Sequence, residues 1–381
     1  MRSIRPGRDR RNGTWAVIAG GGTGGHVVPA IAIARAIVQR GHADSSILFL
    51  GSMRGMERKM VPAAGFEVAL LPGRGIARRL SLGNVGAVAG LVVAALKAMA
   101  IVARLRPSVV ISVGGYASVA GAVAAIVWRI PLVVAEQNAA PGLANRLAAR
   151  FAAASAVSFS GTPLPRAVVT GNPVRPEILA VDRSPRGQAS ARAALGLPAE
   201  GLVVAIAGGS LGSKRINESV LGLVSAWSAR SGVAIRHVIG ERDFGSIAAR
   251  APILPVGGLV YQQVKFEDRM HLLLAAADVA VQRSGASTVS ELAVVGLPSI
   301  LVPLPGAPGD HQTANARRFA EAGAAWVIPD AELDPTRLGE DLERLLTDEG
   351  ARRAMGEAAR RLARPDAADQ VASIAEEHAR G

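Results

Sequence analysis

The sequence predicts an α/β protein made of two doubly wound, Rossmann-like domains that face each other across a cleft. Short apolar runs alternate with helical stretches along all 381 residues, which is typical of parallel sheets covered by helices. The chain is too long for one ordinary core, so two domains are expected. A strand, a glycine-rich turn and a helix recur midway, from Leu202 to Ser213 and beyond, which indicates that a second domain begins there.

Composition and charge narrow the classes of partner. The chain has 43 Lys and Arg against 30 Asp and Glu, a net charge of +13 that favours anionic lipids, phosphorylated ligands or nucleic acid. Aromatic residues make up only 3% and no recognisable nucleic-acid motif occurs, so we expect no nucleic-acid partner. The absence of cysteine excludes disulfides and thiolate metal sites and fits a reducing compartment.

The basic segment 1–13 precedes the first apolar run. That run is short and is better explained as a strand, so a signal peptide is not expected and the segment is predicted to be a disordered tail. The first domain is placed at 14–178, with a helix at Pro29–Arg40 and strands at 14–19, 47–50, 68–71, 108–113, 131–135, 156–158 and 167–170.

The second domain is placed at 179–364, because the polar, proline- and glycine-containing stretch near Asp182–Gln188 is typical of a domain junction. A charged helix is expected over 337–361 and a final helix over 363–379, and residues 365–381 are expected to pack back on the first domain. Strands are expected at 202–207, 234–239, 259–264, 279–281 and 299–302.

The first glycine-rich turn, Gly20-x-Gly22-x-x-Gly25, has the spacing and context of a dinucleotide-binding fingerprint. That fingerprint also requires an acid at the end of the second strand, where this chain has Gly51-Ser52. We therefore expect the turn to face a phosphate or a sugar, and an NAD-dependent oxidoreductase is disfavoured.

His26 follows this turn at the start of a helix. The helix dipole disfavours a protonated imidazole there, so a neutral ring able to act as a base is one interpretation. The alternative is a histidine that only forms hydrogen bonds with the loop.

Further glycine-rich or polar turns follow predicted strands at Gly114-Gly115-Tyr116, Glu136-Gln137-Asn138 and Gly208–Ser213. The carboxyl ends of parallel strands meet at one edge of a sheet, where α/β proteins bind ligands. Turn formation and helix capping are the structural alternative for the same residues.

The stretch Ser284–Glu291 begins with a turn of small residues and continues into a helix. Such a helix start leaves backbone N–H groups available for an anion. Thr288-x-x-Glu291 has the spacing of a capping box, so Glu291 caps the helix in one interpretation. In the other, its carboxylate accepts hydrogen bonds from a sugar diol.

The run Val85–Ala103 has one charged residue, Lys97, and is nearly long enough to span a membrane. A lysine inside a span would cost roughly 2.5–3.5 kcal/mol. We therefore expect a helix that packs partly on the sheet, and its apolar face is expected to dock on an anionic membrane beside Arg74, Arg78 and Arg79.

Seven short motifs occur in one order over about residues 14–328. They are GGGTGGHVVPA (20–30), SVGGYAS (112–118), EQN (136–138), GNPVR (171–175), GGSLGS (208–213), SGASTVSE (284–291) and DHQTANA (310–316). With this ordered set, the sequence resembles the MurG family, the bacterial N-acetylglucosaminyltransferases of cell-wall synthesis.

The resemblance implies a two-domain GT-B fold and an inverting transferase. The expected donor is UDP-GlcNAc, and the expected acceptor is the MurNAc 4-hydroxyl of undecaprenyl-pyrophosphoryl-MurNAc-pentapeptide. The implied location is the cytoplasmic face of the bacterial cell membrane, as a peripheral protein.

The resemblance also implies roles for individual residues. His26 is the candidate general base and Glu136 the second candidate, while Gly114, Gly115 and Tyr116 belong to the acceptor side. UDP-GlcNAc would be held by Thr23, Gly24, Gly25, Asn138, Arg175, Ser210, Glu267, Ala286, Ser287, Thr288, Val289, Ser290, Glu291 and Gln312.

No metal and no cofactor are expected, because the chain contains no Asp-x-Asp pair to hold a metal-bound diphosphate. Helix N-termini and Arg175 would stabilise the departing UDP instead. The alternatives are another GT-B transferase with a lipid or natural-product acceptor, and a non-catalytic nucleotide-sugar-binding or membrane-scaffold protein.

Overall fold

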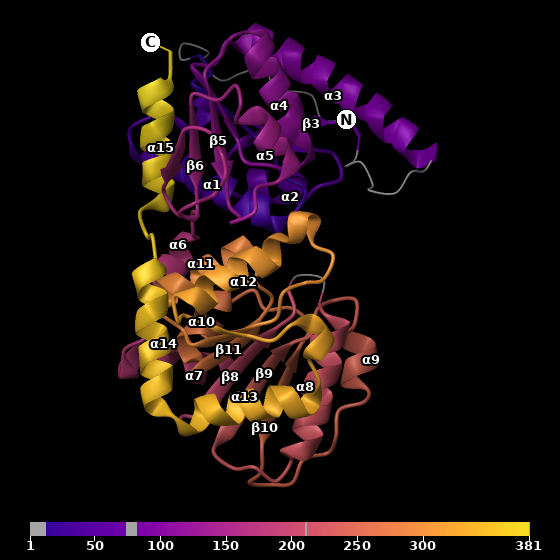
Figure 1. Ribbon diagram of the computed structural model, residues 1–381, viewed down its shortest axis with the longest axis vertical. Coiled ribbons are helices and arrows are strands. Elements are labelled where there is room, and N and C mark those ends of the chain that lie inside the picture. The colour runs from indigo at the N-terminus through magenta and orange to yellow at the C-terminus, as the bar shows by residue number, and fades with distance from the viewer. Residues whose placement is uncertain (1–12, 74–81, 210–211, 381) are drawn as a thin grey trace. The chain divides into compact units, whose positions relative to one another are not determined.

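The computed structural model describes residues 13–73, 82–209 and 212–380 (Figure 1). Contacts divide the chain into two compact units. The first contains the residues up to Gln137, Pro141–Pro173 and the residues from Asp366 onward, and the second contains Asn138–Ala140 and Val174–Pro365. Several predictions fall outside the described residues: those for the basic tail, for Arg74, Arg78 and Arg79, and for Ser210.

The first unit is built on a seven-stranded sheet with the order β3-β2-β1-β4-β5-β6-β7. Every neighbouring pair is parallel. The order reverses between β1 and β4, which makes this point the switch point of a doubly wound sheet. The strands are β1 (Ala16–Ala19), β2 (Ile47–Ser52), β3 (Glu67–Leu71), β4 (Val109–Ser112), β5 (Leu132–Glu136), β6 (Ala154–Val157) and β7 (Ala167–Val169).

Helices cover both faces of this sheet, so its strands are apolar throughout rather than alternating. Ala16 and Ile18 pack in one core with α1, α2 and α15, whereas Val17 and Ala19 pack in the other with α3, α4 and α5. The helices are α1 (Gly24–Gln39), α2 (Glu57–Ala63), α3 (Leu82–Leu105), α4 (Tyr116–Val127), α5 (Leu143–Ala148) and α15 (Ala367–His378), with a 3-10 turn η1 (Asp44–Ser46).

The second unit repeats this topology with six strands in the order β10-β9-β8-β11-β12-β13, all parallel. Its switch point lies between β8 and β11. The strands are β8 (Leu202–Ala207), β9 (Val233–Val238), β10 (Val260–Val264), β11 (Val279–Gln282), β12 (Ser299–Leu301) and β13 (Trp326–Val327). The doubly wound α/β fold predicted from the sequence is therefore confirmed in both units.

Apolar residues of β8, β11 and β12 pack with α8 and α13 in the main core of the second unit. The helices are α6 (Pro176–Leu179), α7 (Pro185–Leu195), α8 (Lys214–Ala226), α9 (Phe244–Ala248), α10 (Met270–Ala276), α11 (Ala286–Val295), α12 (His311–Glu321), α13 (Pro335–Thr347) and α14 (Glu349–Leu362). Two 3-10 turns, η2 (Pro308–Asp310) and η3 (Asp330–Glu332), complete the unit.

Three predicted helices differ from the observed ones. The helix expected over 337–361 is two helices, because the side chain of Asp348 accepts a hydrogen bond from Ala351 N and begins α14. α1 begins at Gly24 rather than Pro29, and Pro29 in the second turn removes only the hydrogen bond to the carbonyl of Gly25. α3 is longer than the run Val85–Ala103; it packs partly on the sheet, as expected, and chiefly against α4.

Candidate active site

One group of candidate site residues lies at the switch point of the first unit. The turn after β1 contacts the turn after β4, because Gly21 N donates to Gly114 O over 3.2 Å. Gly115 has a φ of +86°, and a Cβ atom there would lie 2.1 Å from Gly21 O. Only glycine at this position allows the two turns to approach so closely.

His26 is the third residue of α1, and it is half-buried. It lies close to the turn after β4, because a Cβ atom at Gly114 would be 3.0 Å from its Cε1. Its Nδ1 lies 3.1 Å from Gln137 Oε1, while Gln137 Nε2 donates to Ala135 O over 2.9 Å. Because Gln137 presents an acceptor to His26, Nδ1 carries the proton and the lone pair of the neutral ring is on Nε2. The sequence pointed to His26 but missed Gln137 as the residue that sets its tautomer.

Glu136, the second candidate base, is buried, with 3% of its surface exposed. Its Oε2 accepts hydrogen bonds from Gly142 N (3.0 Å) and Asn145 Nδ2 (2.9 Å). Both bonds go to the same carboxylate oxygen, and they fix the loop between β5 and α5.

Glu57 is a buried carboxylate that contacts the first turn, and no motif in the sequence points to it. Gly22 N donates to its Oε2 over 2.8 Å and Ser52 N donates to its Oε1 over 2.5 Å. A Cβ atom at Gly21 would lie 2.5 Å from this carboxylate. This chain has no acid at the end of β2, where the dinucleotide fingerprint requires one. It has Glu57 at the start of α2 instead, and this carboxylate binds the backbone of the glycine-rich turn.

Tyr116 begins α4 beside these turns. Its hydroxyl donates to Pro72 O over 2.9 Å, and burial raises the pKa of this phenol. The side chain thus holds the end of β3 against the start of α4. Thr23, Gly24 and Gly25 form the start of α1, where Thr23 O accepts from the backbone N–H groups of His26 and Val27.

Another group of candidate site residues lies at the switch point of the second unit, where β11 leads into α11. Gly285 is the N-cap of α11 and has no side chain to offer as a cap. The first N–H groups of the helix, from Ala286 to Thr288, therefore have no intrahelical acceptor and can bind an anion. Ser287 Oγ is buried and has no hydrogen-bond partner among the described residues.

Glu291 does not cap α11, so that interpretation of Thr288-x-x-Glu291 is wrong. The helix begins at Ala286, which places Glu291 in its second turn. Its Oε1 accepts from Arg175 Nε (3.1 Å) and Nη2 (2.9 Å). Burial raises the pKa of Glu291, and the charge of Arg175 opposes that effect. Both contacts go to Oε1, so among the described residues no donor occupies Oε2.

Asn315 links three segments of the second unit through hydrogen bonds, a role that no sequence pattern predicted. It is fully buried; its Oδ1 accepts from Ala139 N over 2.9 Å, and its Nδ2 donates to Ser284 O (3.1 Å) and Asn138 Oδ1 (3.2 Å). Gln312 lies in the same helix, where its backbone oxygen accepts from Ser284 Oγ (2.8 Å) and its Oε1 from Leu304 N (3.0 Å). The structure thus brings Asn138 and Gln312 to the turn that precedes α11.

Glu267 lies at a separate place in the second unit, after β10. Its carboxylate is buried and accepts from Arg236 Nε (2.8 Å) and Nη2 (2.6 Å), and its other oxygen accepts from Arg269 N (3.1 Å). The side chain therefore fixes the loop, and the backbone of that loop is the part left to meet a ligand.

Comparisons with known proteins agree with this arrangement of two Rossmann-like domains. Residues 16–157 match the glycosyltransferase family 28 N-terminal domain, and residues 203–371 match the glycosyltransferase family 28 C-terminal domain. The fold and its two switch-point sites thus define the class as a two-domain glycosyltransferase of the GT-B type.

The curated relatives identify the family to which the chain belongs within this class of glycosyltransferases. A protein from Desulforudis audaxviator (strain MP104C) is 39% identical over 94% of this chain and 97% of its own length, and one from Acidothermus cellulolyticus (strain ATCC 43068 / DSM 8971 / 11B) is 39% identical over 95% and 97%. Both are named UDP-N-acetylglucosamine–N-acetylmuramyl-(pentapeptide) pyrophosphoryl-undecaprenol N-acetylglucosamine transferase. The chain belongs to this family of transferases, the MurG family, as its motifs indicated.

Solved structures support the same fold. The MurG of Acinetobacter baumannii superposes with a TM-score of 0.75 at 28% identity, over 95% of this chain and 99% of the other. The glycosyltransferase of kitacinnamycin superposes with a TM-score of 0.71 at 17% identity, over 97% and 99%, a likeness of fold alone.

Proposed function

We propose that the chain transfers N-acetylglucosamine from UDP-GlcNAc to the 4-hydroxyl of MurNAc in undecaprenyl-pyrophosphoryl-MurNAc-pentapeptide, with inversion of the anomeric centre. The observation that carries this proposal is the 39% identity to transferases of that name over 94% of the chain. The residues at the two switch points provide the groups that this reaction requires.

The donor is assigned to the second unit. The uncapped N-terminus of α11 binds the diphosphate, because its N–H groups and the helix dipole both favour negative charge. Oε2 of Glu291 accepts hydrogen bonds from the ribose hydroxyls, while Arg175 keeps the carboxylate in place through Oε1. Arg175 is 36% exposed and also carries a charge that stabilises the departing UDP.

The acceptor is assigned to the first unit. His26 Nε2 accepts the proton of the MurNAc hydroxyl as that oxygen attacks the anomeric carbon, and the bond from this carbon to the UDP oxygen breaks. Gln137 holds the tautomer that this step requires. Inversion follows from a single displacement, in which the hydroxyl attacks on the face opposite the leaving UDP.

Membrane docking is assigned to α3, because the acceptor carries a lipid. Val92, Val93 and Leu96 are 53%, 46% and 57% exposed, and the neighbouring Lys97 is exposed as well. Apolar side chains next to a cation bind an anionic lipid surface. Within the described ranges, no helix has the length and apolar character needed to cross a bilayer. The lipid-linked acceptor and the exposed apolar residues of α3 support a peripheral protein at the cytoplasmic face of the membrane.

The test is a transfer assay with UDP-GlcNAc and a lipid-linked pyrophosphoryl-MurNAc-pentapeptide, run in excess EDTA. We expect disaccharide product and stoichiometric release of UDP. Transfer only to a diacylglycerol or a soluble aglycone would support the other class of GT-B transferase. UDP binding with neither transfer nor donor hydrolysis would indicate a non-catalytic binding protein.

A further inference from the structure

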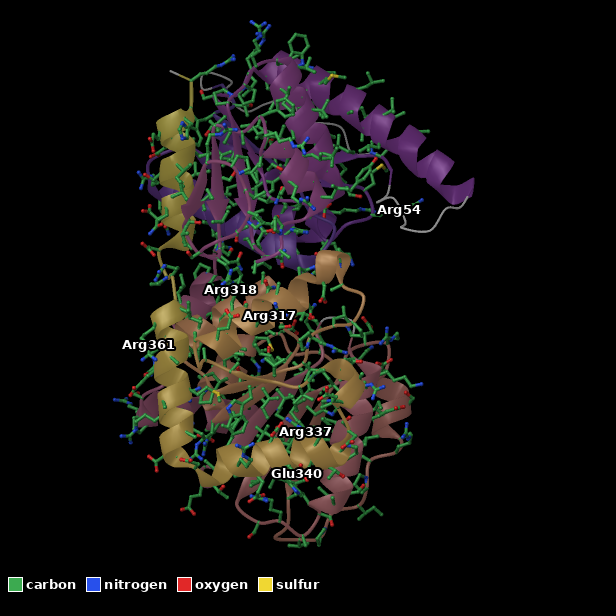
Figure 2. All side chains as sticks on the ribbon, in the orientation of Figure 1. Arg54, Arg317, Arg318, Arg337, Glu340 and Arg361 are labelled. Atoms are coloured by element: carbon green, nitrogen blue, oxygen red, sulfur yellow. The ribbon has the colours of Figure 1, made fainter. Side chains whose placement is uncertain are left out.

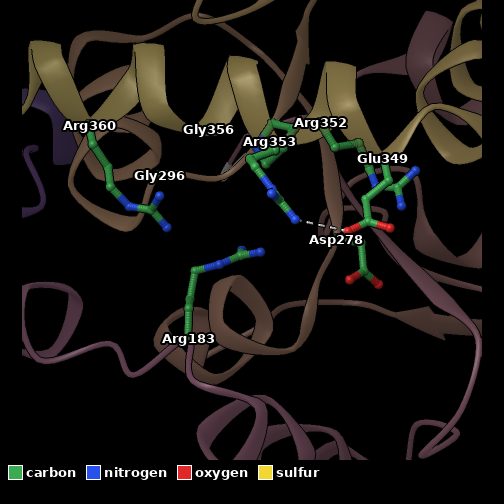
Figure 3. Close-up of a pocket in the computed structure, with 9 residues that line it drawn as sticks. Arg183, Asp278, Gly296, Glu349, Arg352, Arg353, Gly356 and Arg360 are labelled. Atoms are coloured by element: carbon green, nitrogen blue, oxygen red, sulfur yellow. Dashed lines mark hydrogen bonds and ion pairs between the residues drawn. The ribbon is translucent and has the colours of Figure 1, made fainter.

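A hollow of about 300 Å³ in the second unit lies away from the candidate donor residues (Figure 3). Asp278 precedes β11 and Gly296 ends α11, so the hollow is at the amino ends of the strands, whereas the donor residues follow their carboxyl ends. Its lining residues are Arg183, Asp278, Gly296, Pro298, Glu349, Arg352, Arg353, Gly356 and Arg360.

The lining carries more positive than negative charge, with four arginines against two carboxylates. Asp278 is already engaged, because its oxygens accept from Val203 N (2.7 Å), Arg192 Nη2 (2.8 Å) and Gln188 Nε2 (3.0 Å). Glu349 lies at the rim with 77% of its side chain exposed and meets Arg353 over 3.3 Å. An exposed pair of this kind is weak, so neither carboxylate neutralises the hollow.

Arg183 shows the effect of this imbalance. It is half-buried, and its Nη1 donates to one backbone oxygen, Leu274 O, over 3.2 Å. Burial lowers the pKa of Arg183; Asp278 opposes this, and the neighbouring Arg360 and Arg192 lower it further. A partly buried cation beside other cations is stabilised by an anion that enters the same space.

The guanidinium groups differ in what they already bind. Arg352 donates to Leu345 O (2.6 Å) and Leu346 O (2.8 Å), which satisfies the end of α13. Arg360 lies against the C-terminus of α11, where a Cβ atom at Gly296 would be 2.4 Å from its Nε. That helix end attracts a cation but carries only a partial charge. Figure 3 shows Arg183, Arg353 and Arg360 directed toward the same space.

We propose that this hollow is a binding site for a small soluble phosphoryl anion, of the phosphate or pyrophosphate class, held by Arg183, Arg353 and Arg360. Planar guanidinium groups match the oxygens of a phosphoryl group and form paired hydrogen bonds with them. Gly356 allows α14 to approach the end of α11 closely, because a Cβ atom there would lie 2.7 Å from Gly296 O, and this approach brings Arg360 to the hollow.

The experiment is calorimetric titration of inorganic pyrophosphate into the full chain and into four variants. Arg183→Gln and Arg360→Gln, separately and together, remove guanidinium groups from the hollow. Arg361→Gln is the matched control, because Arg361 is exposed on the same helix and does not line the hollow (Figure 2). The difference in pyrophosphate affinity between the variants reports binding in the hollow, because binding at the donor site is the same in all of them.

We expect the unaltered chain and Arg361→Gln to bind alike, with an affinity that falls as salt is added. Each substitution in the hollow should weaken binding about tenfold, which is equivalent to about 1.4 kcal/mol. UDP affinity, measured on the same samples, should not change, which shows that the variants remain folded.

Two results would overturn the proposal. One is no binding to the unaltered chain at about 10 mM pyrophosphate, ten times a millimolar Kd. The other is equal binding by the double variant. A third arm uses phosphatidylglycerol vesicles: co-sedimentation that depends on Arg183 and Arg360, without soluble pyrophosphate binding, would reassign the hollow to a lipid headgroup.

Discussion

The ion pair between Arg175 and Glu291 joins the GNPVR motif to the second turn of α11. The side chain of Glu291 is 12% exposed, so its carboxylate is largely removed from water. Without Arg175, burial alone would favour the neutral acid, which donates rather than only accepts. The charge of Arg175 opposes this effect and favours the ionised form, which accepts hydrogen bonds from a diol.

Glu291→Ala is expected to weaken UDP binding by about 1.5–3 kcal/mol, the usual contribution of a hydrogen bond to a charged group. Calorimetric titration of UDP measures this change. Glu291→Gln is the control, since it keeps the shape and one acceptor but not the charge, and it should lose less. An unchanged Kd in Glu291→Ala, combined with a lower melting temperature, would reduce Glu291 to a structural partner of Arg175.

His26→Ala should lower kcat by roughly 10²–10⁴-fold, the usual effect of removing a general base. UDP affinity should stay the same, because the donor is assigned to the other unit. Gln137→Ala keeps His26 but removes the acceptor that holds the proton on its Nδ1. We therefore expect kcat to fall by only about tenfold, with a broadened or shifted pH profile. Near-normal turnover of His26→Ala on the lipid-linked acceptor would remove this residue from the mechanism.

Glu57→Gln should destabilise the first unit by about 1–3 kcal/mol, because its amide offers one acceptor to the two N–H groups that the carboxylate satisfies. Thermal unfolding followed by calorimetry measures the loss. Glu67→Gln, at an exposed glutamate of β3, is the matched control. Equal unfolding curves for the two variants would mean that the bond from Gly22 N does not hold the turn.

At the scale of elements, α3 presents one buried and one exposed apolar face. Ala94, Ala98 and Val102 recur every four residues and are fully buried in the core that α3 shares with α4. Val92 and Leu96 lie outside that stripe and remain exposed. The fold therefore leaves apolar surface on α3 after its own core is complete.

Replacing Val92 and Leu96 together by aspartate should reduce co-sedimentation with anionic vesicles, because it adds charge of the wrong sign to an apolar surface. Charge reversal at Arg74, Arg78 and Arg79 should act in the same direction, and added salt should weaken binding further. Ile253→Asp is the control, at an exposed apolar residue of the second unit. Sedimentation that is the same for all these proteins would contradict docking through α3.

The sequence predicted the strands well, because both sheets are covered on two faces and their strands are continuous apolar runs. It also located the glycine-rich turns, where several glycines have positive φ values. It missed the partners that fix those turns. Glu57 lies 35 residues from Gly22, and Asn315 lies 176 residues from Ala139. Such contacts leave no periodic signal, so only the folded chain reveals them.

For the whole molecule, α15 belongs to the first unit although it comes last in the chain. Val371, Ala372, Ile374 and Ala375 pack in the same core as α1, and Arg40 of the first unit contacts Asp369 and Glu376 over 2.8 Å each. The last helix therefore completes a core that began with β1.

Ile374→Ala should lower the free energy of unfolding by about 2–5 kcal/mol, the usual cost of emptying a buried isoleucine site. Urea denaturation of the full chain measures it. Leu362→Ala is the control, because Leu362 is 37% exposed on α14 and belongs to the second unit. Similar losses for the two variants would show that α15 contributes little to the first core.

The late position of α15 also has a consequence for biosynthesis. The ribosome must translate Val174–Pro365 before it reaches the helix that closes the first unit. At about 5–20 residues per second, this interval lasts roughly 10–40 s. During that time the nascent first unit has its strands and α1 but an uncovered apolar strip where α15 will lie. Until α15 has been translated and packs, this strip is available to molecular chaperones and to neighbouring nascent chains.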